Sequence, residues 1–371
     1  MKKSLLLFFI LVQFVGIHLA SAQLSSRHYL PPLKRSNGFQ TVDGQAIYLS
    51  TPEANAFEVK VYQGTNTTAI ATLSISNSSP AIYTPAVATG GNSNDNNTTL
   101  ITSANSGIVL DIAGLKFEAP SGKKFYVNWR TSNGGQASSL VSAGEAGLGT
   151  DFRWGGTLYP YFSGATQYGN LNSVIGIMAT EDNTLVNISG YDPECTFTKN
   201  GNTAGVNSIT DDLITITLNA GQTFVLEAQL TDPNVLPRAN HRGWLGATIS
   251  SDKKIAVNQG HMGLSVTTGS QDMSMTQITP TSNIGKQYAF IRGNGADIAE
   301  FPIIIATEND TKVYVNNDKS TPYATLNNGE WVQIPSSKYS QSGSQSPGAN
   351  MYVEASKNVY AFQTIDVTYA T

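Results

Sequence analysis

Cysteine and charge are both scarce in this chain. One cysteine, Cys195, occurs among 371 residues, so no disulfide can form within the chain. Charged residues make up 13% of the sequence, and the 26 acidic residues outnumber the 22 basic ones. Nucleic-acid-binding surfaces need clustered Lys and Arg, and small secreted domains usually need disulfides. We therefore expect a protein that binds no nucleic acid and has a core large enough to be stable without disulfides.

The N-terminus has the three parts of a secretory signal peptide. A charged start is followed by an apolar run over residues 5–17 and by a small-residue cleavage site at 20–22. This run is shorter than the roughly 20 apolar residues that span a bilayer, and no later stretch is longer. We predict a signal peptide at residues 1–22 and a linker at 23–39. The mature chain should have no transmembrane segment and should be located outside the cell or on its outer surface, and its lack of disulfides favours a bacterial origin.

Composition and residue alternation predict strands throughout the mature chain. Gly, Tyr, Phe, Thr, Ser and Asn are abundant, and no amphipathic helix pattern follows the signal. Polar and apolar residues alternate in short segments bounded by turn residues, at 57–62, 213–218, 312–315 and 331–334. Residues 174–179 and 301–306 are almost entirely apolar, as central strands covered on both faces are. We predict an all-β fold of tandem antiparallel units, either β-sandwich-like or propeller-like.

Two phrases recur along the chain and indicate an internal repeat. The phrase Ala-Thr-Glu-Asp-Asn-Thr at 179–184 returns as Ala-Thr-Glu-Asn-Asp-Thr at 306–311, each time after an apolar run. A second phrase places Lys123, Lys253 and Lys357 at equivalent positions if the first copy carries two extra loop residues. A repeated unit favours a scaffold that presents surface over a single catalytic centre. We predict three β units, the last one short, at 40–155, 156–290 and 291–371.

The recurring acidic phrase offers oxygen ligands for a hard cation. Glu181, Asp182 and Asp310 carry the carboxylates that Ca²⁺ prefers, which makes them calcium candidates. The alternative is a structural turn, because Asp and Asn before Thr form turns by bonding their own backbone. The spacing of the histidines and of Cys195 is typical of neither a catalytic triad nor a zinc site. We therefore predict no catalytic residue, no other metal site and no cofactor.

An aromatic cluster at residues 152–162 is the strongest candidate for ligand contact. It places Trp154, Tyr159 and Tyr161 next to Gly and Pro in a connecting segment. Such rings stack on sugars or form the centre of a protein interface. The alternative interpretation is that they seal the junction between the first and second units.

Three longer phrases follow one another in an order that resembles a known family. They are the apolar-Ala-Thr-Glu-Asp-Asn-Thr-x-Val phrase, the Gly-x-x-Ile-Ser-Ser-Asp-Lys-Lys-Ile-Ala-Val phrase, and a Gln-Asp-Met segment followed by Gly-Lys-Gln-Tyr, at 174–186, 246–257, 271–280 and 285–288. On these residues the chain resembles the N-terminal domain of the IgGFc-binding protein family over residues 45–371. The resemblance implies a secreted or surface protein, in a form also found in Bacteroidetes.

Together these features predict an exported, non-catalytic protein for binding or adhesion at the cell surface. Its partner would be an extracellular glycan or protein, although no residue of the three phrases identifies an immunoglobulin contact. One alternative is an extracellular protein that binds or degrades polysaccharide. Another, implied by the resemblance, is the N-terminal structural domain of a longer surface protein exported by the type IX secretion system.

Overall fold

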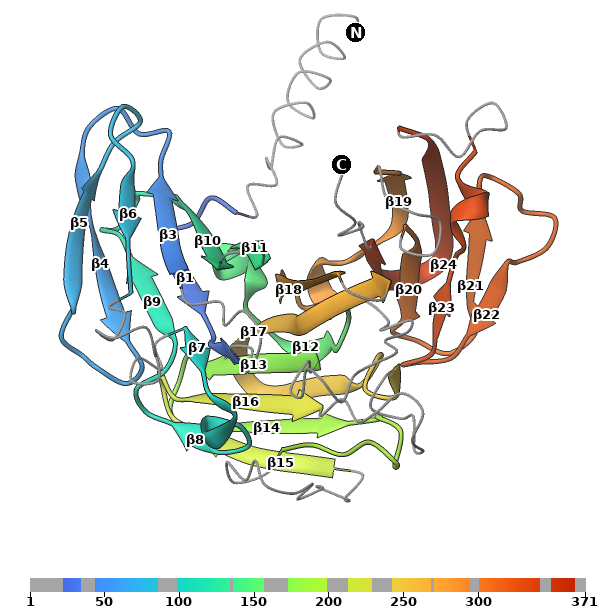
Figure 1. Ribbon diagram of the computed structural model, residues 1–371, viewed down its shortest axis with the longest axis horizontal. Coiled ribbons are helices and arrows are strands. Elements are labelled where there is room, and N and C mark those ends of the chain that lie inside the picture. The colour runs from blue at the N-terminus through green and yellow to red at the C-terminus, as the bar shows by residue number, and fades with distance from the viewer. Residues whose placement is uncertain are drawn as a thin grey trace, which may run out of the picture.

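The computed structural model describes residues 23–34, 44–85, 99–133, 136–156, 173–198, 213–228, 242–267, 270–293, 300–340 and 348–363. These residues form three β modules that follow one another along a crescent (Figure 1). The 3-10 turns among them are η1 (Ser103–Asn105), η2 (Gly144–Gly147), η4 (Thr281–Asn283) and η5 (Ser336–Lys338). No helix in this part of the chain has the length and apolar character needed to cross a bilayer.

The first module, residues 27–141, is a sandwich of two antiparallel sheets. Its strands are β1 (Arg27–Leu30), β3 (Gly44–Ser50), β4 (Phe57–Gln63), β5 (Ala71–Ile75), β6 (Ala81–Tyr83), β9 (Leu115–Glu118), β10 (Tyr126–Asn133) and β11 (Gln136–Val141). One sheet has the order β1-β9-β4-β5 and the other β11-β10-β3-β6. Phe57, Val59 and Val61, alternate residues of β4, are buried in the core between the sheets, as expected for a strand with one covered face.

The second module, residues 149–278, is built on one continuous sheet. Its strands are β12 (Gly149–Arg153), β13 (Ser173–Ala179), β14 (Thr184–Ser189), β15 (Leu213–Leu218), β16 (Thr223–Ala228), β17 (Thr248–Thr267) and β18 (Ser270–Ile278). The order is β15-β14-β17-β13-β16, and β12 and β18 also pair with β17. The short strand β8 (Val109–Leu110) from the first part of the chain extends this sheet beside β16. All residues of β13 and β16 are buried, which explains their nearly continuous apolar sequence.

The third module, residues 285–363, repeats this arrangement with fewer residues. Its strands are β19 (Gly285–Ile291), β20 (Pro302–Ala306), β21 (Thr311–Val315), β22 (Ala324–Leu326), β23 (Trp331–Gln333) and β24 (Asn350–Gln363). The order is β22-β21-β24-β20-β23, and β19 also pairs with β24. Each strand therefore has its counterpart in β12–β17. The first module follows the same path if β9 and β10 together stand for β17.

In each module the chain bends where the strand path β9–β10, β17 or β24 changes its pairing partner. We call this bend the corner, and one hydrogen bond recurs there. The strand pairs first with one neighbour and then with the next, so β17 changes from β14 to β13 between Ser251 and Ile255. At the three corners, a threonine hydroxyl donates to a backbone carbonyl oxygen at an Oγ1–O distance of 2.6–2.8 Å. The pairs are Thr51 with Lys124, Thr180 with Lys254 and Thr307 with Asn358.

The modules share core residues where they meet. Val174, Met273 and Met275 of the second module pack into the core of the first. Phe301 and Tyr360 of the third module belong to the core of the second. The strand β2 (Leu33–Lys34) pairs with β7 (Leu100–Ile101), and the Lys34 ammonium group forms a fully buried ion pair with Glu227 of β16. The three modules are thus joined by apolar packing and, between the first two, by a buried charge pair.

The prediction of an all-β, antiparallel, repeat-built fold is confirmed. The alternating segments at 57–62 and 213–218 coincide with β4 and β15. Within the predicted linker at 23–39, residues 27–30 and 33–34 form β1 and β2, and their buried side chains lie against the first module and its junction with the second. The exact divisions at 155/156 and 290/291 stay a prediction. β12 lies before the first division and β19 extends across the second, and each pairs with a strand that follows.

Candidate binding surfaces

The two acidic phrases form equivalent turns in the second and third modules. Thr184 and Thr311 each donate a hydroxyl hydrogen bond to the carbonyl oxygen three residues earlier, at 2.7 Å in both cases. Asn183 and Asp310 each have a φ of 53°, in the left-handed region that Asn and Asp tolerate better than other side chains. The phrase recurs because the same turn recurs.

The calcium candidates Glu181, Asp182 and Asp310 are exposed on these turns. The Oδ1 atom of Asp182 accepts a hydrogen bond from the Ala220 amide, and the Lys253 ammonium group donates to the Asp182 carbonyl oxygen. A lysine cation beside the turn repels a second cation. Within the described ranges, no three His, Cys, Asp or Glu side chains gather as a metal site. Calcium binding stays a prediction, and the geometry favours the structural turn.

Trp154, the first aromatic candidate, has no exposed surface. Its ring centroid lies 5.3 Å from that of Trp244 and 6.1 Å from that of Phe197. It belongs to the core that the second and third modules share, rather than to a seal between the first and second units. The burial of this ring favours a packing role, and its contact with a ligand stays a prediction. Tyr159 and Tyr161 lie outside the described residues, so their part in binding stays a prediction.

The buried histidine and cysteine are placed for packing rather than for chemistry. His28 on β1 has its Nε2 atom 2.8 Å from the Phe125 carbonyl oxygen, and burial lowers its pKa to about 4. Burial raises the pKa of Cys195 to about 12, so the thiol stays protonated and is a poor nucleophile at neutral pH. Because both side chains are buried in their neutral forms, they can pack in a core without the cost of burying a charge.

A small cavity of about 170 Å³ lies where the second and third modules meet. Trp244, Met275 and Phe362 supply apolar walls, while the buried Gln259 and His261 supply polar groups. The Gln259 Oε1 atom accepts a hydrogen bond of 2.8 Å from the backbone amide of residue 155. These residues come from β17, β18, β24 and the segment before β17, so no local motif in the sequence points to the cavity.

A wider and more open hollow of about 610 Å³ lies on the outer face of the sheet β11-β10-β3-β6. We call this surface the Tyr48 face, after its most prominent ring. Its outward residues are Gly44, Ala46, Tyr48, Ser50, Ile82, Tyr126, Asn128, Arg130, Ser132, Ala137, Ser139 and Val141. The guanidinium carbon of Arg130 lies 5.0 Å from the centroid of the Tyr48 ring. Sequence reasoning missed this surface because the alternation of each strand shows which residues face outward but not which strands are neighbours.

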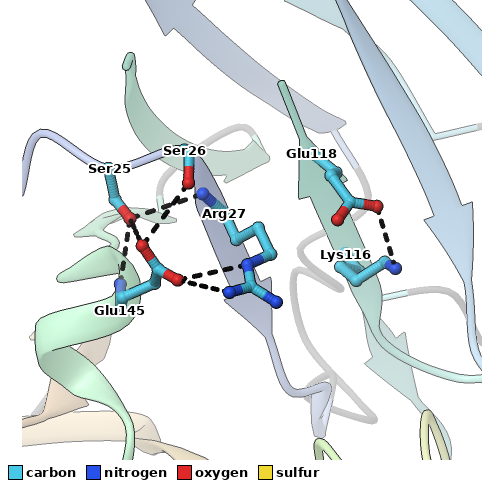
Figure 2. A network of polar contacts seen from close by, with 6 residues as sticks. All are labelled: Ser25, Ser26, Arg27, Lys116, Glu118 and Glu145. Carbon is cyan, nitrogen blue, oxygen red and sulfur yellow. Dashed lines mark hydrogen bonds and ion pairs between the residues drawn. The ribbon is translucent and has the colours of Figure 1, made fainter. Parts of the chain in front are cut away.

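Glu145 connects strand β1 to the chain between the first and second modules (Figure 2). Its Oε1 atom accepts hydrogen bonds from Nε and Nη2 of Arg27, at 3.1 and 2.7 Å. Its Oε2 atom accepts from the hydroxyls of Ser25 and Ser26, at 3.3 and 3.4 Å. Because the Arg27 and Glu145 side chains are 48% and 44% exposed, the pair contributes little stability on its own. The network orients the N-terminal strand and is a structural contact.

The family model for the IgGFc binding protein matches residues 137–369, which is more than half of the chain. The chain therefore belongs to the IgGFc binding protein family. No curated protein and no solved structure matches it. The matched region contains the second and third modules together with β11, and membership of this family supports a function in binding.

Proposed function

We propose that this chain is an exported, non-catalytic binding protein of the cell surface or extracellular space. Membership of the IgGFc binding protein family is the observation that carries the proposal. The signal-like residues 1–22 support export. The neutral burial of His28 and Cys195 supports a function without nucleophilic chemistry.

Binding would use surfaces that the repeated modules display rather than a reacting group. Three copies of one strand order along a crescent expose turns at the module corners and the outer faces of sheets (Figure 1). Strand pairing holds such faces rigid, so binding costs little ordering of the protein. The partner would be an extracellular protein, for which the family name suggests the Fc part of immunoglobulin G, or an extracellular glycan, and adhesion to either would follow.

A function in polysaccharide binding is the second candidate. The open hollow beside Tyr48 favours it, because an exposed aromatic ring beside hydroxyl side chains is a suitable surface for a sugar. A place at the start of a longer surface protein is compatible with either candidate.

The test is a binding array probed with the mature chain, residues 23–371. The array carries immunoglobulin G Fc fragments, extracellular matrix proteins, and neutral and acidic glycans. Saturable binding to one class supports the proposal and identifies the partner class. If the chain is folded by circular dichroism and binds no class on the array, the proposed binding function is overturned and a purely structural role is favoured.

A further inference from the structure

The Tyr48 face is hollow because its central residues are small. Antiparallel pairing places Ala46, Arg130 and Ser139 directly opposite one another across three strands. The next row outward consists of Gly44, Ser132 and Ala137. Side chains in opposite positions are close neighbours, so Arg130 stands alone among small residues. These small residues form the bottom of the hollow, which we call its floor, and the Arg130 side chain is the one long polar group that extends from it.

A third row closes one side of this floor. It consists of Ile82, Tyr48, Asn128 and Val141, again directly opposite one another across four strands. Tyr48 is 39% exposed and Ile82 is 54% exposed, so both present apolar surface to a bound molecule. The hollow therefore has an apolar aromatic edge and a polar floor, the combination that small-molecule sites use for affinity and orientation.

Arg130 is held in place by neutral groups. Its Nε atom donates a 2.8 Å hydrogen bond to Oδ1 of Asn128, and its guanidinium group lies over the Tyr48 ring. Both contacts orient the planar group and leave its charge uncompensated, since no described ion pair involves Arg130. Arg130 is also the single charged residue among the described outward residues of this face. An oriented guanidinium without a counter-charge is suited to a carboxylate, which it binds through two parallel hydrogen bonds.

We propose that the Tyr48 face binds a carboxylate-bearing sugar residue of an extracellular polysaccharide. The carboxylate would pair with the Nη atoms of Arg130, the sugar ring would stack against Tyr48, and the hydroxyls of Ser132 and Ser139 would bond the sugar hydroxyls. The open floor of small residues and hydroxyls leaves room for a sugar ring, whose C–H face can stack on Tyr48 while its hydroxyls reach the serines. This inference rests on the proposed binding function and names its ligand class. The face lies mostly before residue 137, where the family match begins.

The test uses the mature chain and matched ligands. An array carries oligomers of galacturonic, glucuronic, mannuronic and sialic acids, with acidic peptides and neutral glycans beside them. The tightest acidic oligomer is then titrated by calorimetry together with its methyl ester, which has the same ring without the charge. We expect the ester to bind roughly 10- to 100-fold more weakly, because charge-assisted hydrogen bonds are lost.

Three variants locate the site. Arg130→Gln should weaken binding of the acidic oligomer by roughly 10- to 100-fold, and Tyr48→Ala should also weaken it, whereas Tyr48→Phe should retain most of it because stacking needs the ring. The matched control is Lys60→Gln, which removes one exposed positive charge from β4 in the other sheet of the same module and should leave binding unchanged. Thermal unfolding of each variant confirms that it is folded.

Several outcomes would overturn the inference while leaving the proposed function intact. They are equal binding of the ester and the acid, unchanged binding by Arg130→Gln, and a chain that binds only acidic peptides, neutral glycans or another protein. A folded chain that binds nothing on either array would overturn both. Tight binding of one acidic sugar that depends on Arg130 and not on Lys60 supports the site.

Discussion

The first and second modules share a strand order but differ in their long central strand. In the second module, β17 runs unbroken from Thr248 to Thr267 and bends at a bulge. In the first module, residues 119–125 interrupt the same path and separate β9 from β10. Pro120 opens this insertion and Gly122 adopts a φ of 80°, so the extra residues turn instead of extending the strand. The first module is consequently two sheets and the second is one.

The two versions nevertheless keep the same corner. Thr51 bonds the Lys124 carbonyl oxygen across the interrupted strand, as Thr180 bonds that of Lys254 across the bulge. The neighbouring lysines also contact the facing turn in both modules, Lys123 through the Glu53 carboxylate and Lys253 through a backbone carbonyl. The corner, rather than an unbroken strand, therefore defines the repeated unit. This explains why the lysine and threonine phrases recur while loop lengths vary.

The largest expected effect comes from deleting the buried tryptophans of the two cores. Trp129 lies in the first-module core and Trp154 in the core of the second and third modules, and both are fully buried. Replacing either by Ala should cost about 3–5 kcal/mol of unfolding free energy, because it removes apolar contacts and leaves a cavity. Urea unfolding measures the cost, and the partly buried Trp331→Ala is the milder control.

Hydrogen exchange then shows how separate the modules are. Trp129→Ala should raise exchange mainly in β3–β11, and Trp154→Ala mainly in β12–β24. If both variants raise the exchange rate equally along the whole chain, the modules unfold as one unit. They would then have no separate unfolding free energies to compare.

The buried ion pair between the first two modules has the next largest expected effect. Lys34→Met leaves the Glu227 carboxylate buried without its lysine and should cost about 3–5 kcal/mol. The double variant Lys34→Met/Glu227→Leu removes both charges and should recover most of this loss. Urea unfolding of the two single variants and the double variant measures the coupling. Additive losses would show that the pair does not act as a unit.

Acid should lower the unfolding free energy of the first module, because His28 becomes protonated. Burial lowers its folded-state pKa to about 4, while Glu145 acts in the opposite direction to a smaller extent. The unfolded imidazole, with a pKa near 6.5, binds a proton at a higher pH than the folded one. The stability contribution of the neutral ring is therefore full above about pH 6.5 and is lost as the pH falls towards 4, by up to about 3 kcal/mol.

The measurement is the urea midpoint at pH 7.5 and at pH 4.5, for the wild type and for His28→Leu. The wild type should lose more stability between the two conditions than the variant, which lacks the His28 imidazole. An equal loss in both would assign the acid effect to groups other than His28.

The smallest effect tests the shared corner directly. Replacing Thr51, Thr180 or Thr307 by Val removes one side-chain hydrogen bond at equivalent positions and should cost about 1 kcal/mol each. Thermal unfolding compares the three variants with a Thr→Val change at the exposed Thr72 of β5. A cost at Thr180 and Thr307 without one at Thr51 would show that the interrupted strand no longer relies on the corner.

The strands and the repeat were readable from the sequence because their signals are local. The alternation over 57–62 reflects one covered face of β4, and the apolar run at 174–179 reflects complete burial of β13. The acidic phrase was readable as a turn because its bonds lie within four residues, as between Thr184 and the Glu181 carbonyl oxygen. The strands β1 and β2, which lie within the segment predicted as a linker, were not predicted because they are short and pair with distant partners.

The candidate surfaces were much less accessible to sequence reasoning. Trp154 was a candidate for ligand contact because it belongs to an aromatic cluster with Gly and Pro, yet its burial depends on Phe197 and Trp244, far along the chain. Arg130 is an isolated charge in the sequence, and nothing near it indicates the ring of Tyr48. The two meet because β3 and β10 pair in one particular register.

From its sequence alone this chain is a repeat-built, all-β protein with a signal-like start, since short-range alternation and turn chemistry set those features. Tertiary structure decided which side chains became surface and which became core. A shift of one residue in strand register moves every side chain to the opposite face, and register depends on the whole sheet. The Tyr48 face, the cavity between the second and third modules and the contact between Lys34 and Glu227 therefore exist only once distant strands have paired.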